Sequence, residues 1–301
     1  MKKIIFTFIT IFAVTVVYSQ ETETIETENE WKHYTDSIES TLKYEYGAIE
    51  LENGVARLVI PVGYKFLNAQ QAQFVLADIY GNPEDESVLG LIIPENQSIF
   101  FEDAGYVFEV YYDEIGYVKD GDADHINYND LLKNLQKETD GANPKRIEAG
   151  YNPITLVGWA SKPYYDKNKK ILHWAKELKF GDAEVNTLNY NVRFLGRKGV
   201  LVLNAIADMP ALPVVQEDLP KILDIVQFNA GYKYKDFDPS IDEVAKWTIG
   251  ALVAGKVLTK VGIGALLLKF WKVIVLAVSA FFGGFGKKLF GKKKKIKVSG
   301  V

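Results

Sequence analysis

The residues best suited to chemistry lie in the segment KDGDADHINYND, where Asp120, Asp122 and Asp124 alternate along the chain. This is the spacing of the first three ligands of a calcium-binding loop, in which carboxylate oxygens coordinate the cation. Such a loop also needs glycine at its sixth position and a bidentate glutamate at its twelfth, where this chain has His125 and Leu131. We therefore predict a polar turn leading into a helix here, and no metal site.

A second set of candidates, Trp159, Asp166, His173 and Arg193, follows in two pairs of strand-like runs. The chain has three histidines, none spaced to share a metal, and no cysteine, so the sequence predicts no zinc site. No serine stands in a GxSxG turn, and a pair of glycosidase carboxylates cannot be chosen by spacing among 39 acidic residues. The aromatic Trp159 suits either a bound sugar or protein, or the core. We take both sets as candidate ligand-binding residues and predict neither a catalytic residue nor a cofactor.

The elements that must position these residues are mainly strands. β-branched residues around Pro61 and Gly63 indicate two strands joined by a bend, and Asn127 is placed to cap a helix over 128–137. Further strands are expected at 88–94 and 104–118, two hairpins at 154–180 and 187–208, and helices at 31–42, 69–80 and 219–226, the last beginning with Pro220. The pattern predicts an α+β fold, an antiparallel sheet of hairpins with a few covering helices, over a single extracytoplasmic domain at 46–238. Residues 20–45 predict an acidic tether with a short helix.

The N-terminus has the layout of a signal peptide. Lys2 and Lys3 precede an apolar run from Ile4 to Val17, and we expect cleavage between Ser19 and Gln20, which makes residues 1–19 the signal peptide. An uncleaved anchor is the alternative, but the run is shorter than the roughly 20 residues that cross a bilayer.

The C-terminal part differs in charge from the rest. Between Val244 and Val301 there are 12 lysines and no acidic residue, whereas residues 20–243 carry 21 basic residues against all 39 acidic ones. Such a split indicates that the two parts face different surroundings. Residues 270–290 are apolar between flanking lysines and predict a transmembrane helix. By the positive-inside rule, the lysines of residues 287–301 predict a basic cytoplasmic tail.

The segment 244–268 is also apolar but carries Lys246, Lys256 and Lys260. At about 100° per residue these lysines fall within one arc of a helix, so we expect an amphipathic interfacial helix on the outer leaflet. A hairpin of two short membrane spans stays open as an alternative, although it would bury lysines and place the tail outside.

Several longer segments of the chain form a recognisable set: GVARLVIPVGYKFL from Gly54, YGNP from Tyr80, GYVKDGDAD from Gly116, GWASKPYYD from Gly158, LHWAKEL from Leu172, LNYNVRFLGRKGVLVLNA from Leu188, FNAGYKYKDF from Phe228 and ALVAG from Ala251. In these segments the chain resembles the bacterial family of membrane-anchored proteins classed as domain of unknown function 2167 (DUF2167). The resemblance implies an architecture and a membrane address, and it transfers no catalytic residue.

These features predict a single-pass protein of the cytoplasmic (inner) membrane, with the N-terminal domain outside and the C-terminus in the cytoplasm. We expect a non-enzymatic binding or interaction module that contacts the lipid bilayer and an envelope protein or polymer, and its acidity argues against nucleic acid. One alternative is an envelope hydrolase that uses the Asp, His and Arg side chains named above. Another is an oligomeric structural component of the membrane that associates through Gly250, Ala254 and Gly255.

Overall fold

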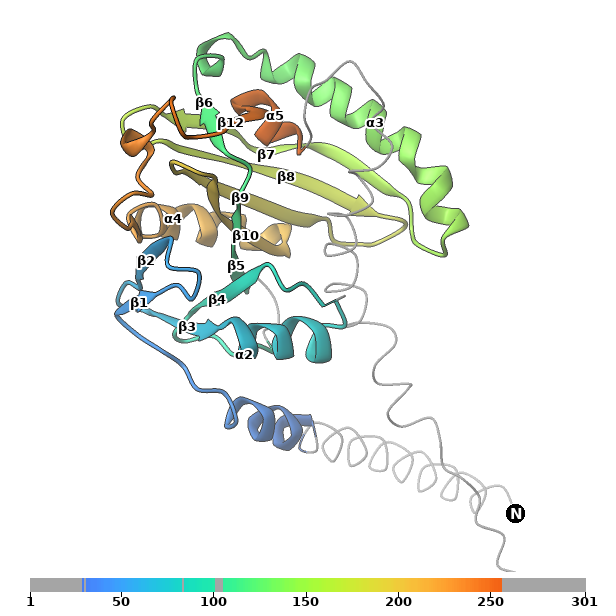
Figure 1. Ribbon diagram of the computed structural model, residues 1–301. Coiled ribbons are helices and arrows are strands. Elements are labelled where there is room, and N and C mark those ends of the chain that lie inside the picture. Colours follow the sequence, from blue (N-terminus) through green and yellow to red (C-terminus); the bar gives the residue numbers. More distant parts are fainter. Residues whose placement is uncertain (1–28, 30, 83, 101–104, 256–301) are drawn as a thin grey trace, which may run out of the picture. The chain divides into compact units, whose positions relative to one another are not determined.

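The computed structural model describes residue 29 and residues 31–82, 84–100 and 105–255 (Figure 1). They form two compact units, one of residues 31–43 with Ser98–Phe100 and the other of residues 44–97 and 105–255. In the smaller unit residues 31–39 are helical, and Glu39 accepts hydrogen bonds from the Ser98 hydroxyl (2.9 Å) and the Ile99 amide (3.3 Å).

Several predicted segments lie outside this description: the signal peptide, residues 20–28 and 30 of the acidic tether, the transmembrane helix at 270–290 and the basic tail. Within the residues that are described, no helix is both long and apolar enough to cross a membrane.

The larger unit is built on a seven-stranded sheet with the strand order β3-β4-β5-β10-β9-β8-β7. The bounds are β3 Tyr64–Asn68, β4 Val88–Pro94, β5 Tyr106–Asp113, β7 Ile154–Asp166, β8 Ile171–Phe180, β9 Thr187–Leu195 and β10 Val200–Asp208. All neighbouring strands are antiparallel. The predicted α+β class with an antiparallel sheet of hairpins is confirmed.

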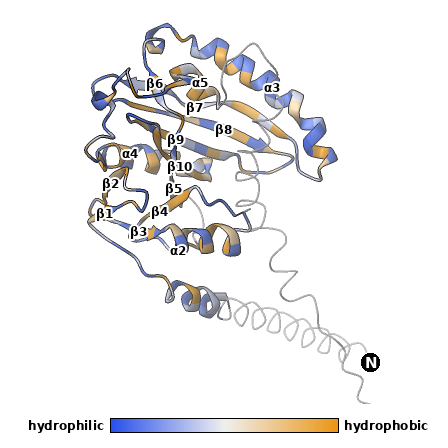
Figure 2. Ribbon diagram, in the orientation of Figure 1, coloured by the Kyte–Doolittle hydropathy of each residue, from blue (hydrophilic) through white to orange (hydrophobic). Residues whose placement is uncertain are grey.

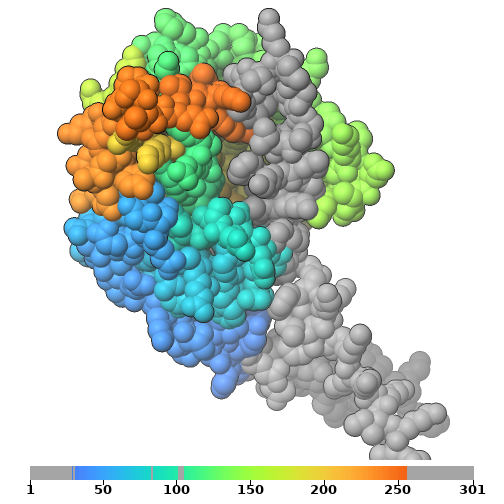
Figure 3. Space-filling model, in the orientation of Figure 1, coloured from blue at the N-terminus to red at the C-terminus, as the bar shows by residue number. Residues whose placement is uncertain are grey.

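Two smaller sheets complete the strands of this unit. One has the order β1-β2-β11 (Ala48–Glu50, Ala56–Val59 and Val226–Phe228), and the other is a parallel pair of β6 (Tyr117–Lys119) and β12 (Val244–Thr248). In Figure 3 orange residues lie directly against green residues, the colours that the bar gives to β12 and β6.

Helices cover both faces of the large sheet (Figure 1). They are α2 (Ala69–Gln73) with the π-helical turn η1 (Phe74–Ile79), η2 (Ala123–His125), α3 (Tyr128–Glu148), η3 (Met209–Ala211), α4 (Leu212–Ile222), η4 (Tyr234–Asp236) and α5 (Ile249–Ala254). Apolar residues of α4 join the β1-β2-β11 sheet and one face of the large sheet in the main core. On the other face, α5 packs on β8, β9 and β10, and α3 packs on β7 and β8.

The local sequence explains most of these boundaries. The Asn127 side chain accepts hydrogen bonds from the Asn129 and Asp130 amides and so caps α3, as predicted, although α3 continues well beyond residue 137. β4 is apolar along nearly its whole length because it is buried on both faces (Figure 2).

One predicted helix is misplaced along the chain. α4 begins at Leu212 and ends at Ile222, so the helix expected at 219–226 is wrong in position. Pro213 gives the same start signal as Pro220 but stands earlier in the sequence, in the first turn of α4.

The amphipathic helix expected over 244–268 is wrong for its first residues. Val244–Thr248 pairs with β6 as a strand, and Ile249–Ala254 is a short helix whose residues are all buried in the larger unit. The apolar character of α5 therefore reflects core packing, and this unit continues past Asp238, where we expected the domain to end. Residues 256–268 lie outside the description.

Candidate functional site

Asp120 belongs to a small polar cluster that joins four segments of the chain. Its carboxylate accepts hydrogen bonds from the Tyr165 hydroxyl (2.8 Å), the Lys170 ammonium (2.7 Å) and the Tyr234 hydroxyl (3.2 Å). Burial by itself raises the pKa of Asp120, but these donors outweigh it and hold the pKa below its ordinary value. The carboxylate is thus fully used in holding the fold together.

The other two aspartates of the alternating motif face different partners. Both carboxylate oxygens of Asp122 accept backbone amides at the start of α5, from Ile249 and Gly250, each at 3.1 Å. The carboxylate of Asp124 pairs with Lys167. Across the described residues no group of three His, Cys, Asp or Glu side chains is arranged to hold a metal ion. The motif organises a loop and a helix start.

Asp166 and Trp159 also have structural contacts. Asp166 accepts the backbone amides of Asn168 (2.8 Å) and Lys169 (2.9 Å), which shapes the turn between β7 and β8. The indole nitrogen of Trp159 donates to the Tyr128 carbonyl at 3.2 Å, which holds the start of α3 against β7.

His173 and Arg193 lie on opposite faces of the large sheet. His173 pairs with Val192 in the β8–β9 register, one residue before Arg193, and successive side chains of a strand alternate between faces. The imidazole of His173 lies 3.2 Å from the Tyr190 hydroxyl, and burial lowers its pKa. The structure therefore does not bring the seven predicted candidates into one site, and Arg193 is the one that lines the cavity described next.

Arg193 belongs to a polar surface that is buried in the middle of the sheet. Glu109, Asn204, Asn191 and Trp174 pair in one straight row across β5, β10, β9 and β8, and all are at most 7% exposed. Arg193 stands beside this row, with its guanidinium carbon 5.6 Å from the centre of the Trp174 ring. Polar side chains here occupy positions that a sheet covered by helices normally fills with apolar ones.

A directional chain of hydrogen bonds connects this surface. The Arg193 guanidinium donates to Asn191 (3.3 Å), Asn191 to Asn189 (2.7 Å), Asn189 to Asn204 (2.9 Å) and Asn204 to Glu109 (3.5 Å). Every donor points toward Glu109. The chain fixes the orientation of three amides and presents a charged group at each end.

These residues line a cavity of about 420 Å³, within the size range of small-molecule sites. Its lining comes from α2, η1, the loop before β4 and the start of β4, from strands β5, β8, β9, β10 and β12, and from α5 and the residues next to these elements. The lining residues are Gln73, Leu76, Asn82, Asp85, Ser87, Val88, Glu109, Tyr111, Asp113, Ile115, Trp174, Lys176, Asn189, Asn191, Arg193, Asn204, Trp247, Leu252, Val253 and Gly255. We call this site the sheet cavity.

Three lining side chains carry a buried polar atom with no hydrogen-bond partner among the described residues. They are Trp174 Nε1, Arg193 Nε and Asn82 Oδ1. Buried polar atoms are almost always paired, with protein, water or ligand. Their gathering around one cavity is the feature expected where another molecule supplies the missing partners.

Burial also perturbs the charged groups of the sheet cavity. It raises the pKa of Glu109 to about 7, with a further contribution from the Asp85 carboxylate, and raises the pKa of Asp113. It lowers the pKa of Lys176 to about 8, helped by the nearby Arg193. Each shift disfavours the charged form, a pattern common at functional sites.

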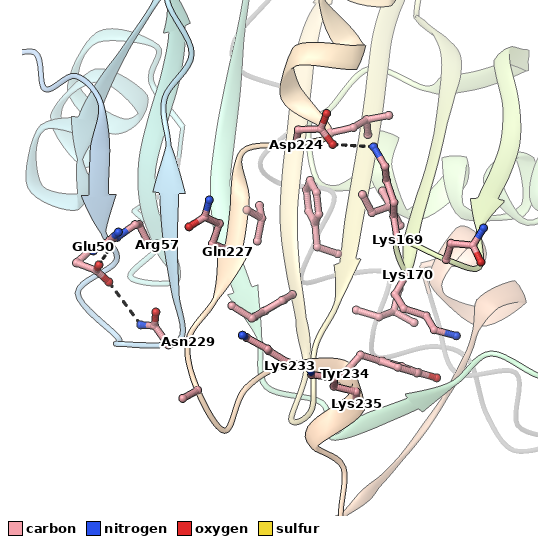
Figure 4. Close-up of a pocket in the computed structure, with 18 residues that line it drawn as sticks. Glu50, Arg57, Lys169, Lys170, Asp224, Gln227, Asn229, Lys233, Tyr234 and Lys235 are labelled. Carbon is pink, nitrogen blue, oxygen red and sulfur yellow. Dashed lines mark hydrogen bonds and ion pairs between the residues drawn. The ribbon is translucent and has the colours of Figure 1, made fainter.

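A second hollow of about 830 Å³ is lined by the turn before β8, the end of β9, the residues after α4, and β11 and η4 (Figure 4). Its basic lining residues are Arg57, Lys169, Lys170, Lys233 and Lys235. Arg57 is paired with Glu50 (2.5 Å) and Lys169 with Asp224 (2.7 Å), and all four side chains are about half exposed or more. Exposed pairs of this kind contribute little energy, so the sheet cavity is the better candidate site.

Three asparagines could have indicated the sheet cavity from the sequence, but they were not among the predicted site residues. Asn189, Asn191 and Asn204 alternate with apolar residues in two strands that form the centre of the sheet, although asparagine is disfavoured in strands. Polar positions alternating along a hairpin normally face solvent. Three asparagines on one face of a central hairpin mark that face as unusual.

Comparison with known proteins identifies a family and no activity. The family model described as "Protein of unknown function (DUF2167)" matches residues 43–283. A search of curated proteins finds no match. Among solved structures, the cyanobacterial PsbP (CyanoP) from Synechocystis sp. PCC 6803 is similar at 10% identity and a TM-score of 0.34, over 62% of this chain and 92% of its own. A point mutant of the protein Mog1 is similar at 11% identity and a TM-score of 0.33, over 62% and 96%. The Saccharomyces cerevisiae Ran-binding protein Mog1p is similar at 11% identity and a TM-score of 0.29, over 60% and 84%.

Proposed function

We propose that this chain, which belongs to the family of proteins of unknown function DUF2167, is a membrane-anchored binding module that holds a small polar ligand in its sheet cavity. The module stands on the outer face of the cytoplasmic membrane and performs no covalent chemistry. Its partners are the lipid bilayer and a ligand from the cell envelope.

The observation that carries the binding function is the buried polar surface of the central strands. Burying an acid and several amides costs free energy unless their hydrogen bonds are satisfied. Here the amides satisfy one another, while Trp174 Nε1, Arg193 Nε and Asn82 Oδ1 stay unpaired within the described fold. A ligand that bonds to these atoms would offset this cost, which gives the arrangement a reason to exist.

The membrane address rests on the two ends of the chain. The N-terminal lysines and apolar run have the layout of an export signal, and the lysine-rich C-terminus follows a long apolar stretch. The acidic residues all precede Val244, as expected for a domain that stands apart from the basic tail.

Two observations favour this proposal over the alternatives. The hydrolase hypothesis needs His173 and Arg193 to act together, and they lie on opposite faces of the sheet. The oligomer hypothesis needs Gly250, Ala254 and Gly255 to be available to another chain, and of these Gly250 and Ala254 are buried while Gly255 is exposed.

The binding function is tested by looking for a small compound that the full-length protein retains when it is purified in detergent. After washing and denaturation, mass spectrometry should detect a released small polar compound at a level at least about tenfold above that from Asn191→Leu, which removes the central amide of the hydrogen-bond chain. Thr155→Leu, at an exposed position of β7, is the matched control and should retain the compound. Equal yields from the wild type and a folded Asn191→Leu variant would contradict the proposal.

The address is tested by cysteine labelling, since the chain has no cysteine of its own. A membrane-impermeant maleimide applied to intact cells stripped of their outer barrier should label Ser240→Cys. It should label Ser299→Cys, in the basic tail, only after the membrane is permeabilised. Labelling of both sites before permeabilisation, or of neither, would be incompatible with a single span.

A further inference from the structure

The sheet cavity has walls of opposite charge. Glu109 and Asp113 extend from β5, with Asp85 from the loop before β4 close enough to raise the pKa of both. The cations Lys176 and Arg193 extend from β8 and β9. Between them the wall is neutral and consists of amides.

The distance between the walls follows from the strand order. β5 and β9 are two steps apart, and β5 and β8 are three. At about 4.8 Å per step, the backbones of the strands that carry the acidic and the basic groups are separated by roughly 10 to 14 Å. This is an upper limit for the charged groups, because the Arg193 side chain reaches across to the Tyr111 hydroxyl of β5. A tripeptide in extended form has a similar length of about 10 Å.

The unpaired atoms near the basic wall are both donors. Trp174 Nε1 and Arg193 Nε can give a hydrogen bond but cannot accept one. Arg193 also directs its Nη1 to the Tyr111 hydroxyl (3.3 Å) and its Nη2 to Asn191 (3.3 Å), which leaves the Nε edge for another group. A guanidinium edge beside an indole N–H matches a carboxylate, the planar acceptor that arginine prefers.

The acidic wall requires the opposite chemistry. Among the described residues, Glu109 accepts one long hydrogen bond, from Asn204. Burial disfavours the charged form of Glu109 and Asp113, and an ammonium group beside them would restore it. The wall therefore matches a donor with positive charge.

We propose that the ligand of the sheet cavity is a small zwitterion, no longer than a tripeptide, with its carboxylate at Arg193 and Trp174 and its ammonium at Glu109. This inference rests on the proposed binding function and specifies the chemical class of its ligand. A neutral polyol would satisfy the hydrogen bonds but would supply no counter-charge to Glu109 or Lys176, whereas the charge of Arg193 already acts on Asp113 and lowers its pKa against the effect of burial.

The test uses tri-L-alanine and two derivatives that each lack one charge. After any copurified compound has been removed by exhaustive dialysis, isothermal titration calorimetry of the full-length protein in detergent should show saturable binding of trialanine. N-acetyl-trialanine and trialanine amide should bind more weakly by about tenfold or more, because each loses a charge-assisted hydrogen bond. Sucrose, a neutral polyol, should not bind.

Variants at the two walls show which wall binds which end of the ligand. In Arg193→Met, trialanine and its amide should bind equally, while the acetylated peptide stays weaker. In Glu109→Gln, trialanine and its acetylated form should bind equally. Trp174→Phe keeps the ring and removes only the indole N–H, so it tests the carboxylate end if Arg193→Met does not fold. A change in selectivity for one end is a result that mere structural damage would not produce.

The outcomes separate this inference from the function on which it rests. Binding of all three peptides with equal affinity would overturn the zwitterion. Binding of sucrose without binding of trialanine would also overturn it and leave the cavity-binding function standing. If no probe binds although a compound copurifies with the wild type, the zwitterion falls and the cavity-binding function stands. If no probe binds and no compound copurifies, both proposals fall.

Discussion

Once any bound ligand has been removed, replacing Glu109 with glutamine should stabilise the protein at pH 8 by about 3 kcal/mol and leave its stability at pH 4 nearly unchanged. Burial raises the pKa of Glu109 from 4.5 to about 7 in the folded protein. Below pH 4.5 the acid is protonated in both the folded and the unfolded chain, so it has no effect. As the pH rises from 4.5 to 7 the unfolded chain loses the proton first, and the free energy of unfolding falls. Above pH 7 the cost of a buried charge is complete.

Glutamine removes this cost because it has the shape of protonated glutamate and still accepts the hydrogen bond from Asn204. The other charged groups near position 109 are Asp85, Asp113 and Arg193, and all of them stay in the variant. The difference between wild type and variant therefore isolates one titration. Denaturant unfolding of the full-length proteins at pH 4 and pH 8 measures it. A variant less stable than the wild type at pH 8 would mean that Glu109 is ionised and well paired.

Replacing Gly199 with alanine should destabilise the fold by about 3 kcal/mol. A Cβ atom at this position would lie 2.1 Å from the backbone oxygen of Asp113 and 2.8 Å from the Tyr112 hydroxyl. The contact with a backbone atom cannot be relieved by rotating a side chain. The strands β10 and β5 would have to separate where Val200 pairs with Asp113, at the edge of the sheet cavity.

Gly121→Ala is the matched control for this substitution. Gly121 lies in the aspartate loop, and a Cβ atom there would meet nothing within 4 Å. Thermal unfolding of the two variants should show a lower melting temperature for Gly199→Ala by several degrees and little change for Gly121→Ala. Equal melting temperatures would show that the β5–β10 junction tolerates the added atom.

The antiparallel hairpins were predictable because their signals are local. The run from Ile154 to Phe180 has apolar and aromatic residues on both sides of the polar turn DKNKK, and the run from Thr187 to Asp208 contains glycine at its turn. The cap of α3 by Asn127 was predictable for the same reason. In each case the residues that decide the structure are close in sequence.

The segment after Asp238 could not be predicted in this way. A run such as IGALVA is equally apolar in a core helix and at a membrane, and periodicity does not separate the two. What decides its place is β12, which pairs with β6 more than a hundred residues earlier, and Asp122, which caps α5. Contacts of such long range leave no local pattern.

The candidate site was the least predictable part. The aspartate motif attracted attention because its spacing is regular, yet its three carboxylates serve three separate contacts. Of the predicted residues Arg193 lines the sheet cavity, whereas Glu109, Asn204 and Trp174 were not selected. Their role depends on strands from distant parts of the chain lying in the order β5-β10-β9-β8, which single-sequence patterns do not reveal.

The ligand-binding function of the sheet cavity is tested most directly by an experimental structure of the full-length protein purified from its own membrane. We expect density for a compact molecule in the sheet cavity, within hydrogen-bond distance of Trp174 Nε1, Arg193 Nε and Glu109. A cavity in which these atoms instead bond to one another, or to ordered water alone, would contradict a ligand-binding function.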